Sequence, residues 1–217
     1  MAQRTVAVVD YGMGNLRSVV QALKHVAPSE VEVVVSDQAA VVDAAERVVL
    51  PGQGAMRDCM SALSASGLMA PVLRACEHKP VFGVCVGMQM LLSHSEEGAV
   101  DSLGVIPGVV RRFQLDGRTQ ADGSRFKVPQ MGWNRVFYAH PRPHPLFDGV
   151  PDGTYYYFVH SYHAQPEATQ HGVAFADYGG IFCAAVAQDN VFATQFHPEK
   201  SADQGLALYR NFIHWNP

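Results

Sequence analysis

The chain has 217 residues, 48% of them hydrophobic and 17% charged, which is typical of a globular protein with one sizeable core. Its net charge of −4 gives no electrostatic footprint for nucleic acid, and its four cysteines lack the spacing of a zinc site or a disulfide scaffold. Because neither a signal-peptide core nor an apolar stretch of membrane-spanning length is present, we expect a cytoplasmic protein with one domain over residues 1–217, no cofactor and no metal.

The first half of the chain alternates strand-like and helix-like patterns, as parallel strands joined by helices do. In chain order we predict a strand over residues 5–9, a helix over 15–26, a strand over 31–35, a short helix over 39–45, a strand over 48–50, a loop over 51–54 and helical stretches up to about His78. These elements predict an α/β fold whose central sheet is mostly parallel and flanked by helices.

A glycine pair, Gly12 and Gly14, lies between the first predicted strand and the first helix, where a dinucleotide-binding fingerprint would stand. The third glycine of that fingerprint is replaced by Arg17, and no P-loop pattern occurs in the sequence. The sequence therefore predicts no nucleotide site.

Cys85 stands in the segment Gly83-Val84-Cys85-Val86-Gly87, after the apolar run 80–82 and before a helix-like stretch over 88–92. This arrangement is typical of a nucleophile elbow, in which small flanking residues let the chain turn sharply from strand to helix and expose one side chain. The helix N-terminus beneath the sulfur favours thiolate over thiol. A lone cysteine is more often a buried core residue, so this interpretation depends on finding partner groups.

The predicted loop over residues 51–54, Pro51-Gly52-Gln53-Gly54, has a role beside such an elbow. A tetrahedral intermediate needs two N–H donors, and we expect them from Val86, after the nucleophile, and from Gly52, at a neighbouring strand end. Glycine also permits a peptide flip that forms the oxyanion hole only on demand. The alternative is an ordinary tight turn.

The second half of the chain changes to shorter β-like runs separated by turn signals, over residues 105–113, 135–138, 155–159, 173–176, 181–187 and 191–196. Ser201-x-x-Gln204 predicts a capping box at the start of the last helix, and Trp215 near its end is expected to pack on the core. Five histidines lack the helical spacing of a metal site, so we interpret them as loop or rim residues: His140, His144, His160, His163 and His171.

His197 follows the last predicted strand, and Glu199 comes two residues later. A thiol nucleophile needs an imidazole to move protons, and the imidazole needs an acceptor that fixes its tautomer. Cys85, His197 and Glu199 supply these three roles, and the sequence therefore predicts a cysteine-based catalytic triad.

The elbow and the segment His197-Pro198-Glu199 resemble those of the class I, or triad, glutamine amidotransferases, which have a flavodoxin-like fold. Other segments are similar to those of the glutaminase subunits of imidazole glycerol phosphate synthases, and the resemblance runs from the first strand to the last helix. These segments are 10–16, 50–55, Pro129-Gln130-Met131-Gly132-Trp133-Asn134 and Tyr157-Phe158-Val159-His160-Ser161-Tyr162. Val84 and Val86 replace the bulkier aliphatic residues that are common beside the family's cysteine, and Gln53 stands where the family often has an aliphatic residue, a change that could alter how readily the oxyanion loop flips.

The resemblance implies that Cys85 attacks the side-chain amide of glutamine, that His197 protonates the departing ammonia and that Glu199 holds the imidazole. Ammonia would then pass to a separate (β/α)8-barrel cyclase subunit in a heterodimer, for histidine biosynthesis. By position in the family, the expected glutamine-binding residues are Gly54, Gln89, His160, Ser161 and Tyr162. The positions that match the docking face and ammonia gate are Met13, Trp133, Tyr157 and Lys200.

Three alternatives remain on the same fold. A γ-glutamyl hydrolase or peptidase would use the same triad in an open cleft, and a non-catalytic regulatory module would normally lack one triad member. The glutaminase subunit of pyridoxal phosphate synthase also feeds a barrel, but the segment 129–134 argues against it.

Overall fold

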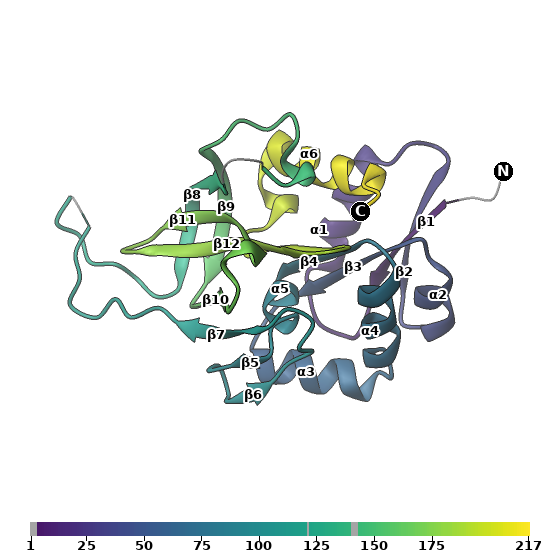
Figure 1. The fold of residues 1–217 in the computed structure, drawn as a ribbon, viewed down its shortest axis with the longest axis horizontal. Coiled ribbons are helices and arrows are strands. Elements are labelled where there is room, and N and C mark those ends of the chain that lie inside the picture. Colours follow the sequence, from purple (N-terminus) through teal and green to yellow (C-terminus); the bar gives the residue numbers. More distant parts are fainter. Residues whose placement is uncertain (1–3, 121, 140–142) are drawn as a thin grey trace.

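The computed structural model of the chain describes residues 4–120, 122–139 and 143–217. One half of its sheet consists of parallel strands in the order β2-β1-β3-β4-β13 (Figure 1). The apolar runs of β1, β3, β4 and β13 are buried, as expected for parallel strands covered on both faces, whereas the edge strand β2 exposes Val35. Their bounds are β1 Arg4–Val9, β2 Val31–Ser36, β3 Arg47–Gly52, β4 Val81–Cys85 and β13 Val191–Thr194.

Helices cover both faces of this parallel half, with α1 and α6 above the sheet in Figure 1 and α3 and α4 below it. The helix bounds are α1 Leu16–Val26, α2 Ala39–Ala44, α3 Met56–Ala65, α4 Met69–His78, α5 Val86–Met90 and α6 Ala202–His214. Within the described residues no single helix is long and apolar enough to cross a membrane; the sharply bent pair α3 and α4 passes that test by length and composition alone.

Beyond β13 the sheet continues through mainly antiparallel strands, so the whole sheet is mixed. Their bounds are β5 His94–Ser95, β6 Val100–Asp101, β7 Gly108–Arg112, β8 Gln130–Tyr138, β9 Thr154–His160, β10 Tyr162–Pro166, β11 Gly172–Asp177 and β12 Ile181–Gln188. Short 3-10 turns lie at η1 Pro145–Phe147, η2 Thr169–His171 and η3 Pro198–Lys200. The α/β class and the parallel half are confirmed, whereas β5, β6 and β10 were not predicted.

Two predicted boundaries differ in ways that matter for the site. Pro51 and Gly52 belong to β3 rather than to a loop, and they pair in register with Val84 and Cys85 of β4. The helix after the elbow begins at Val86, directly behind the cysteine, rather than at residue 88. Strand pairing therefore carries the glycine segment to the side of Cys85.

The predicted capping box at Ser201 is wrong. The buried Ser201 hydroxyl donates to the carbonyl of His197 at 2.6 Å and accepts the Tyr157 N–H at 3.0 Å, so it is not free to cap α6. Gln204 instead donates its amide to the carbonyl of Tyr155 at 3.0 Å. These tertiary partners outcompete the local cap and tie the segment after β13 to β9.

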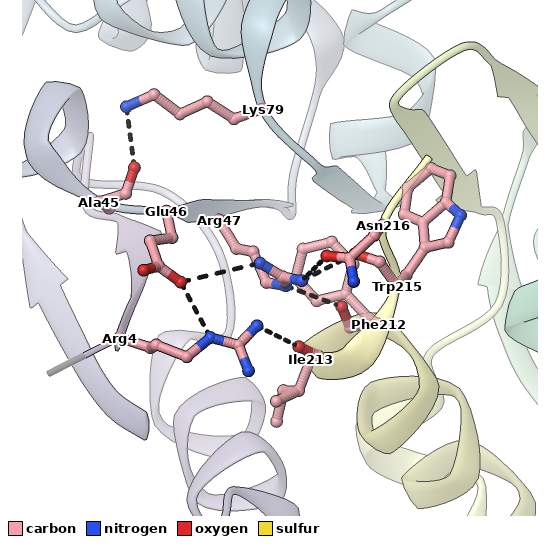
Figure 2. A network of polar contacts seen from close by, with 9 residues as sticks. All are labelled: Arg4, Ala45, Glu46, Arg47, Lys79, Phe212, Ile213, Trp215 and Asn216. Atoms are coloured by element: carbon pink, nitrogen blue, oxygen red, sulfur yellow. Dashed lines mark hydrogen bonds and ion pairs between the residues drawn. The ribbon is translucent and has the colours of Figure 1, made fainter. Parts of the chain in front are cut away.

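The C-terminal end of α6 is held by two arginines from neighbouring strands (Figure 2). The buried Arg47 of β3 donates to the carbonyl of Phe212 at 3.1 Å and to that of Trp215 at 2.7 Å. Arg4 of β1 donates to the carbonyl of Ile213 at 3.2 Å and to the carboxylate of Glu46 at 3.0 Å. The last carbonyls of a helix lack intrahelical donors, and positive charge is favourable there. Trp215 is buried, as predicted.

Candidate active site

Cys85 occupies the turn between β4 and α5 with φ +56° and ψ −111°, a backbone conformation that residues other than glycine rarely adopt. The two flanking glycines permit this turn. A Cβ at Gly87 would lie 2.0 Å from the carbonyl oxygen of Leu50, and one at Gly83 would lie 2.9 Å from the Cβ of Ala193. The surrounding packing therefore holds the cysteine in a strained elbow, as the sequence pattern suggests.

His197 and Glu199 form a buried pair directly after β13. Nδ1 of His197 lies 2.8 Å from Oε1 of Glu199, and the two side chains are 5% and 1% exposed. A carboxylate can only accept, so Nδ1 carries the proton of this bond. Within the described residues Nε2 of His197 makes no hydrogen bond, and His197 lines the same cavity as Cys85. Nε2 is therefore the atom left to exchange protons in the cavity.

Opposing forces act on the charge of the His197 ring. Burial disfavours the imidazolium, but attraction to the Cys85 sulfur in its thiolate form and the hydrogen bond and charge of Glu199 outweigh it, so the pKa of His197 rises. The raised pKa favours the protonated ring, which can give a proton from Nε2 to a leaving group.

A cavity of about 230 Å³ opens beside the cysteine. Its lining includes all the predicted glutamine-binding residues together with the nucleophile and base: Gly54, Cys85, Gln89, His160, Ser161, Tyr162 and His197. Sequence reasoning did not include Glu97, which also lines the cavity and whose carboxylate accepts the N–H of Met56 at 2.9 Å.

The two expected oxyanion donors differ in position. Val86 lines the cavity, whereas Gly52 lies outside the lining, packed so closely on the elbow that a Cβ there would be 2.4 Å from the nitrogen of Gly87. The neighbouring Gln53 lines the cavity, and the thiol of Cys59 lies 3.4 Å from its carbonyl oxygen. Gly54 has φ +100°, the left-handed region that favours glycine. The donor roles of Gly52 and Val86 stay predictions.

His160 is buried in strand β9 rather than on a loop or rim, and it is held neutral. Burial lowers its pKa to about 3. Nδ1 lies 2.8 Å from the carbonyl oxygen of Tyr162, and Nε2 lies 2.9 Å from Oε1 of Gln130. The carbonyl can only accept and a neutral ring has one N–H, so Nδ1 carries the proton, and the Gln130 amide bonds to Nε2 only when it is turned so that its NH2 group takes the place of Oε1. His160 is therefore no second base for this site.

The other histidines form no metal site in the described part of the chain, where no group of three or more His, Cys, Asp or Glu side chains could hold an ion. His144 stacks on Phe192, and His163 packs against Phe113. Burial lowers the pKa of His144 to about 4. His140 lies outside the described residues.

Of the predicted gate and docking residues, Lys200 lines this cavity. Its ammonium lies 5.6 Å from the centre of the Tyr157 ring, and Trp133 contacts the same ring edge-on, with 6.2 Å between the ring centres. Met13 lies against Gly54. Trp133 is 52% exposed. Lys200, Tyr157 and Trp133 thus lie side by side, and Trp133 is accessible to a partner.

Further large apolar side chains on the paired strands β8 and β9 are exposed next to Trp133: Met131, Phe137 and Tyr155. Alternation along β8 places Met131, Trp133 and Phe137 on one face, a period-2 signal that was present in the sequence but not used. An exposed apolar patch of this kind marks a protein interface.

Two buried side chains next to the triad were also missed. Gln195 lies at the bend after β13, two residues before His197, and its side chain lies against Cys85. Tyr209 of α6 is fully buried, and its hydroxyl lies 3.5 Å from Oε2 of Glu199. No local pattern in the sequence links Tyr209 to Glu199.

Comparisons with known proteins agree with this geometry. Residues 7–215 match the family Glutamine amidotransferase class-I. A protein of Aromatoleum aromaticum named imidazole glycerol phosphate synthase subunit HisH is 54% identical over 98% of this chain and 99% of its own length. A protein of Dechloromonas aromatica with the same name is 52% identical over 100% of this chain and 99% of its own length.

Solved structures share the fold at low sequence identity. A crystal structure described as a glutamine amidotransferase has a TM-score of 0.70 at 19% identity and covers 96% of this chain and 97% of its own. PurLQS from Thermotoga maritima has a TM-score of 0.69 at 19% identity, with 98% of each chain covered. These similarities confirm the predicted fold class.

Proposed function

Since the chain belongs to the class I glutamine amidotransferase family, we propose that it is the glutaminase subunit of an imidazole glycerol phosphate synthase, with residues 1–217 as one amidotransferase domain. One observation carries the chemistry: Cys85 sits in a strained elbow on a cavity shared with His197, whose ring is held by Glu199. The relatives that are 50–54% identical carry the assignment to this synthase rather than to another amidotransferase.

The reaction follows from these three side chains. The Cys85 thiolate attacks the side-chain amide carbon of glutamine, and the N–H groups of Val86 and Gly52 stabilise the oxyanion that forms. His197 then gives its Nε2 proton to the departing nitrogen, the C–N bond breaks, and ammonia leaves a glutamyl thioester on Cys85. Glu199 accepts from Nδ1 throughout, so that Nε2 stays aimed at the cavity.

Hydrolysis of the thioester uses the same base. A water molecule gives a proton to Nε2 of His197 as its oxygen bonds to the thioester carbon. The C–S bond then breaks, glutamate is released and the sulfur leaves as thiolate beside the imidazolium. The raised pKa of His197 favours this final ion pair.

The cavity offers a free amino acid both a negatively charged group and neutral polar groups. Glu97 is the carboxylate in the lining that can meet the substrate's α-ammonium, while Gln89 and the backbone of Gly54, His160, Ser161 and Tyr162 supply polar contacts. A γ-glutamyl hydrolase on this fold would have no use for the exposed apolar face next to Trp133, whereas a subunit that delivers ammonia needs such a docking surface.

We propose that this face binds the (β/α)8-barrel cyclase subunit and that ammonia passes between Lys200, Tyr157 and Trp133 to it. The relatives are named as subunits of a synthase, which supports a partner of this kind. A cytoplasmic location stays a prediction. The glutaminase subunit of pyridoxal phosphate synthase would require a different barrel, and copurification with each barrel distinguishes the two.

The proposal is tested by substituting Cys85→Ala in the complex with the cyclase subunit. We expect glutamine-dependent synthesis to disappear and synthesis from added ammonium salts to continue, because the acceptor chemistry resides on the partner. Product formation from each nitrogen source is measured separately. If both activities are lost, or if the wild-type complex does not hydrolyse glutamine, the proposal is wrong.

A further inference from the structure

The side chain of Gln195 joins the nucleophile to the predicted substrate-binding residue Gln89. Gln195 follows β13 directly and is fully buried. Its Nε2 lies 3.8 Å from Sγ of Cys85, and its Oε1 accepts the Nε2 donor of Gln89 at 2.9 Å. Nε2 of Gln89 also donates to the carbonyl of Tyr162 at 2.9 Å. A continuous chain of amides therefore runs from a backbone carbonyl to the sulfur.

This series of hydrogen bonds fixes where the NH2 group and where the oxygen of each side-chain amide lies. The carbonyl of Tyr162 can only accept, so Gln89 must turn its NH2 group toward it. The second hydrogen of that NH2 group points at Gln195, which must accept it with Oε1. Gln195 consequently turns its own NH2 group toward Cys85. The orientation of the donor at the sulfur thus follows from the backbone and needs no assumption about the amides themselves.

We infer that Gln195 is a further catalytic residue of the glutaminase site, donating an N–H to the Cys85 sulfur and stabilising it as thiolate. This inference rests on the proposed function. A hydrogen bond to an ionised acceptor is about twice as strong as a neutral one, and burial strengthens it further. The donor acts twice in the cycle, because the sulfur is a thiolate before it attacks and again when it leaves the glutamyl thioester.

Gln195 and His197 play different parts at the sulfur. The imidazolium supplies charge but gives up its proton to the departing ammonia, so its attraction to the sulfur changes during the reaction. The amide of Gln195 keeps both hydrogens at every step. It is therefore the constant donor at the sulfur, and its loss should slow the chemical steps more than substrate binding.

The test measures how fast Cys85 reacts with iodoacetamide as a function of pH, in the full chain and in its complex with the cyclase subunit. Site-resolved mass spectrometry separates Cys85 from the other buried thiols: Cys59, Cys76 and Cys183. The variants are Gln195→Met, which keeps the volume and removes the donor, and Gln195→Glu, which keeps the shape and places a carboxylate beside the sulfur. Thr194→Val is the matched control, since it removes a buried hydroxyl bonded to the Phe196 carbonyl in the same segment.

For Gln195→Met we expect the midpoint of the alkylation profile to move up by about one pH unit and kcat to fall about tenfold, with KM changed less. Gln195→Glu moves the midpoint further in the same direction once its carboxylate ionises, and it decides the question if the Met variant does not fold. Thr194→Val leaves the alkylation midpoint and kcat at the wild-type values.

Unchanged alkylation profiles and kcat in folded Gln195 variants would overturn the inference. A loss of kcat without a shifted profile would also overturn it, because Gln195 would then act only through Gln89. If the wild-type protein has no glutaminase activity, the proposed function fails, while the alkylation profiles still report whether Gln195 stabilises the thiolate.

Discussion

Replacing Arg47 by methionine should destabilise the whole chain, because this side chain caps the end of α6 from inside the protein (Figure 2). Its guanidinium donates to the carbonyls of Phe212 and Trp215 and to the side chain of Asn216 at 3.0 Å. Methionine removes these donors, so that the Trp215 carbonyl is left without one, while the Phe212 carbonyl keeps only the backbone N–H of Trp215 at 3.2 Å.

The magnitude follows from the number and kind of bonds lost. A hydrogen bond to a charged group contributes about 1.5–3 kcal/mol, and each buried carbonyl left unpaired costs a similar amount. The removed desolvation cost of Arg47 offsets part of this. With both bonds to carbonyls lost and one of the two carbonyls left unpaired, we expect the free energy of unfolding to fall by about 3 kcal/mol. In a protein of this size that lowers Tm by roughly 6–12 °C.

Thermal unfolding followed by circular dichroism measures the effect, with Arg74→Met as the matched control. Arg74 also makes two hydrogen bonds to one neighbour, Asp43, at 3.1 and 2.7 Å, but both side chains are exposed to solvent. Exposed pairs of this kind contribute little, so this variant should melt close to the wild type. Equal losses of Tm in the two variants would refute the reasoning that burial of the acceptor carbonyls decides the cost.

Three further predictions concern activity. His197→Ala should reduce kcat for glutamine hydrolysis roughly tenfold to a hundredfold more than Glu199→Gln, because the carboxylate orients the base without transferring a proton; equal losses would indicate that Glu199 mainly supports the fold. The isolated chain should hydrolyse glutamine about 10²-fold to 10³-fold more slowly than the complex carrying its acceptor ligand, if the Gly52 donor joins the oxyanion hole only in the complex. Similar steady-state rates with and without partner and ligand would exclude such control by the Gly52 peptide. Tyr209→Phe should lower kcat about threefold to tenfold with KM unchanged, because Glu199 loses the donor at its second oxygen. The control is Tyr138→Phe, which loses a hydrogen bond of 3.3 Å to the carbonyl of Pro151, and the same kcat in both variants would contradict the role of Tyr209.

The parallel half of the fold could be predicted because its apolar runs are long and alternate regularly with helical patterns. Strand β10, Tyr162–Pro166, could not, since it is short, carries polar residues and depends on pairing with β7 and β12. The Ser201 cap failed for a related reason. A local pattern cannot reveal that a carbonyl and an N–H from elsewhere in the fold will occupy the hydroxyl.

The candidate site divides in the same way. Cys85, His197 and Glu199 belong to short motifs whose residue types indicate a nucleophile, a base and its acceptor. Their grouping in one site could therefore be predicted before the fold was known. Gln195 and Tyr209 have no such signal, because an amide and a phenol acquire a role only through the groups they meet in space. The neutral state of His160 likewise depends on its burial in the folded chain, which no local pattern reports.

The backbone of Cys85 has a consequence for how this protein evolves. Holding a residue with a side chain at φ +56° and ψ −111° costs about 1–3 kcal/mol of folding free energy. Glycine would avoid most of this cost, because it has no Cβ. Selection for stability alone would therefore replace the nucleophile by glycine, and only selection for glutamine hydrolysis opposes it. In a lineage that obtained its nitrogen from free ammonium, mutational drift at this position would run toward a more stable and inactive chain.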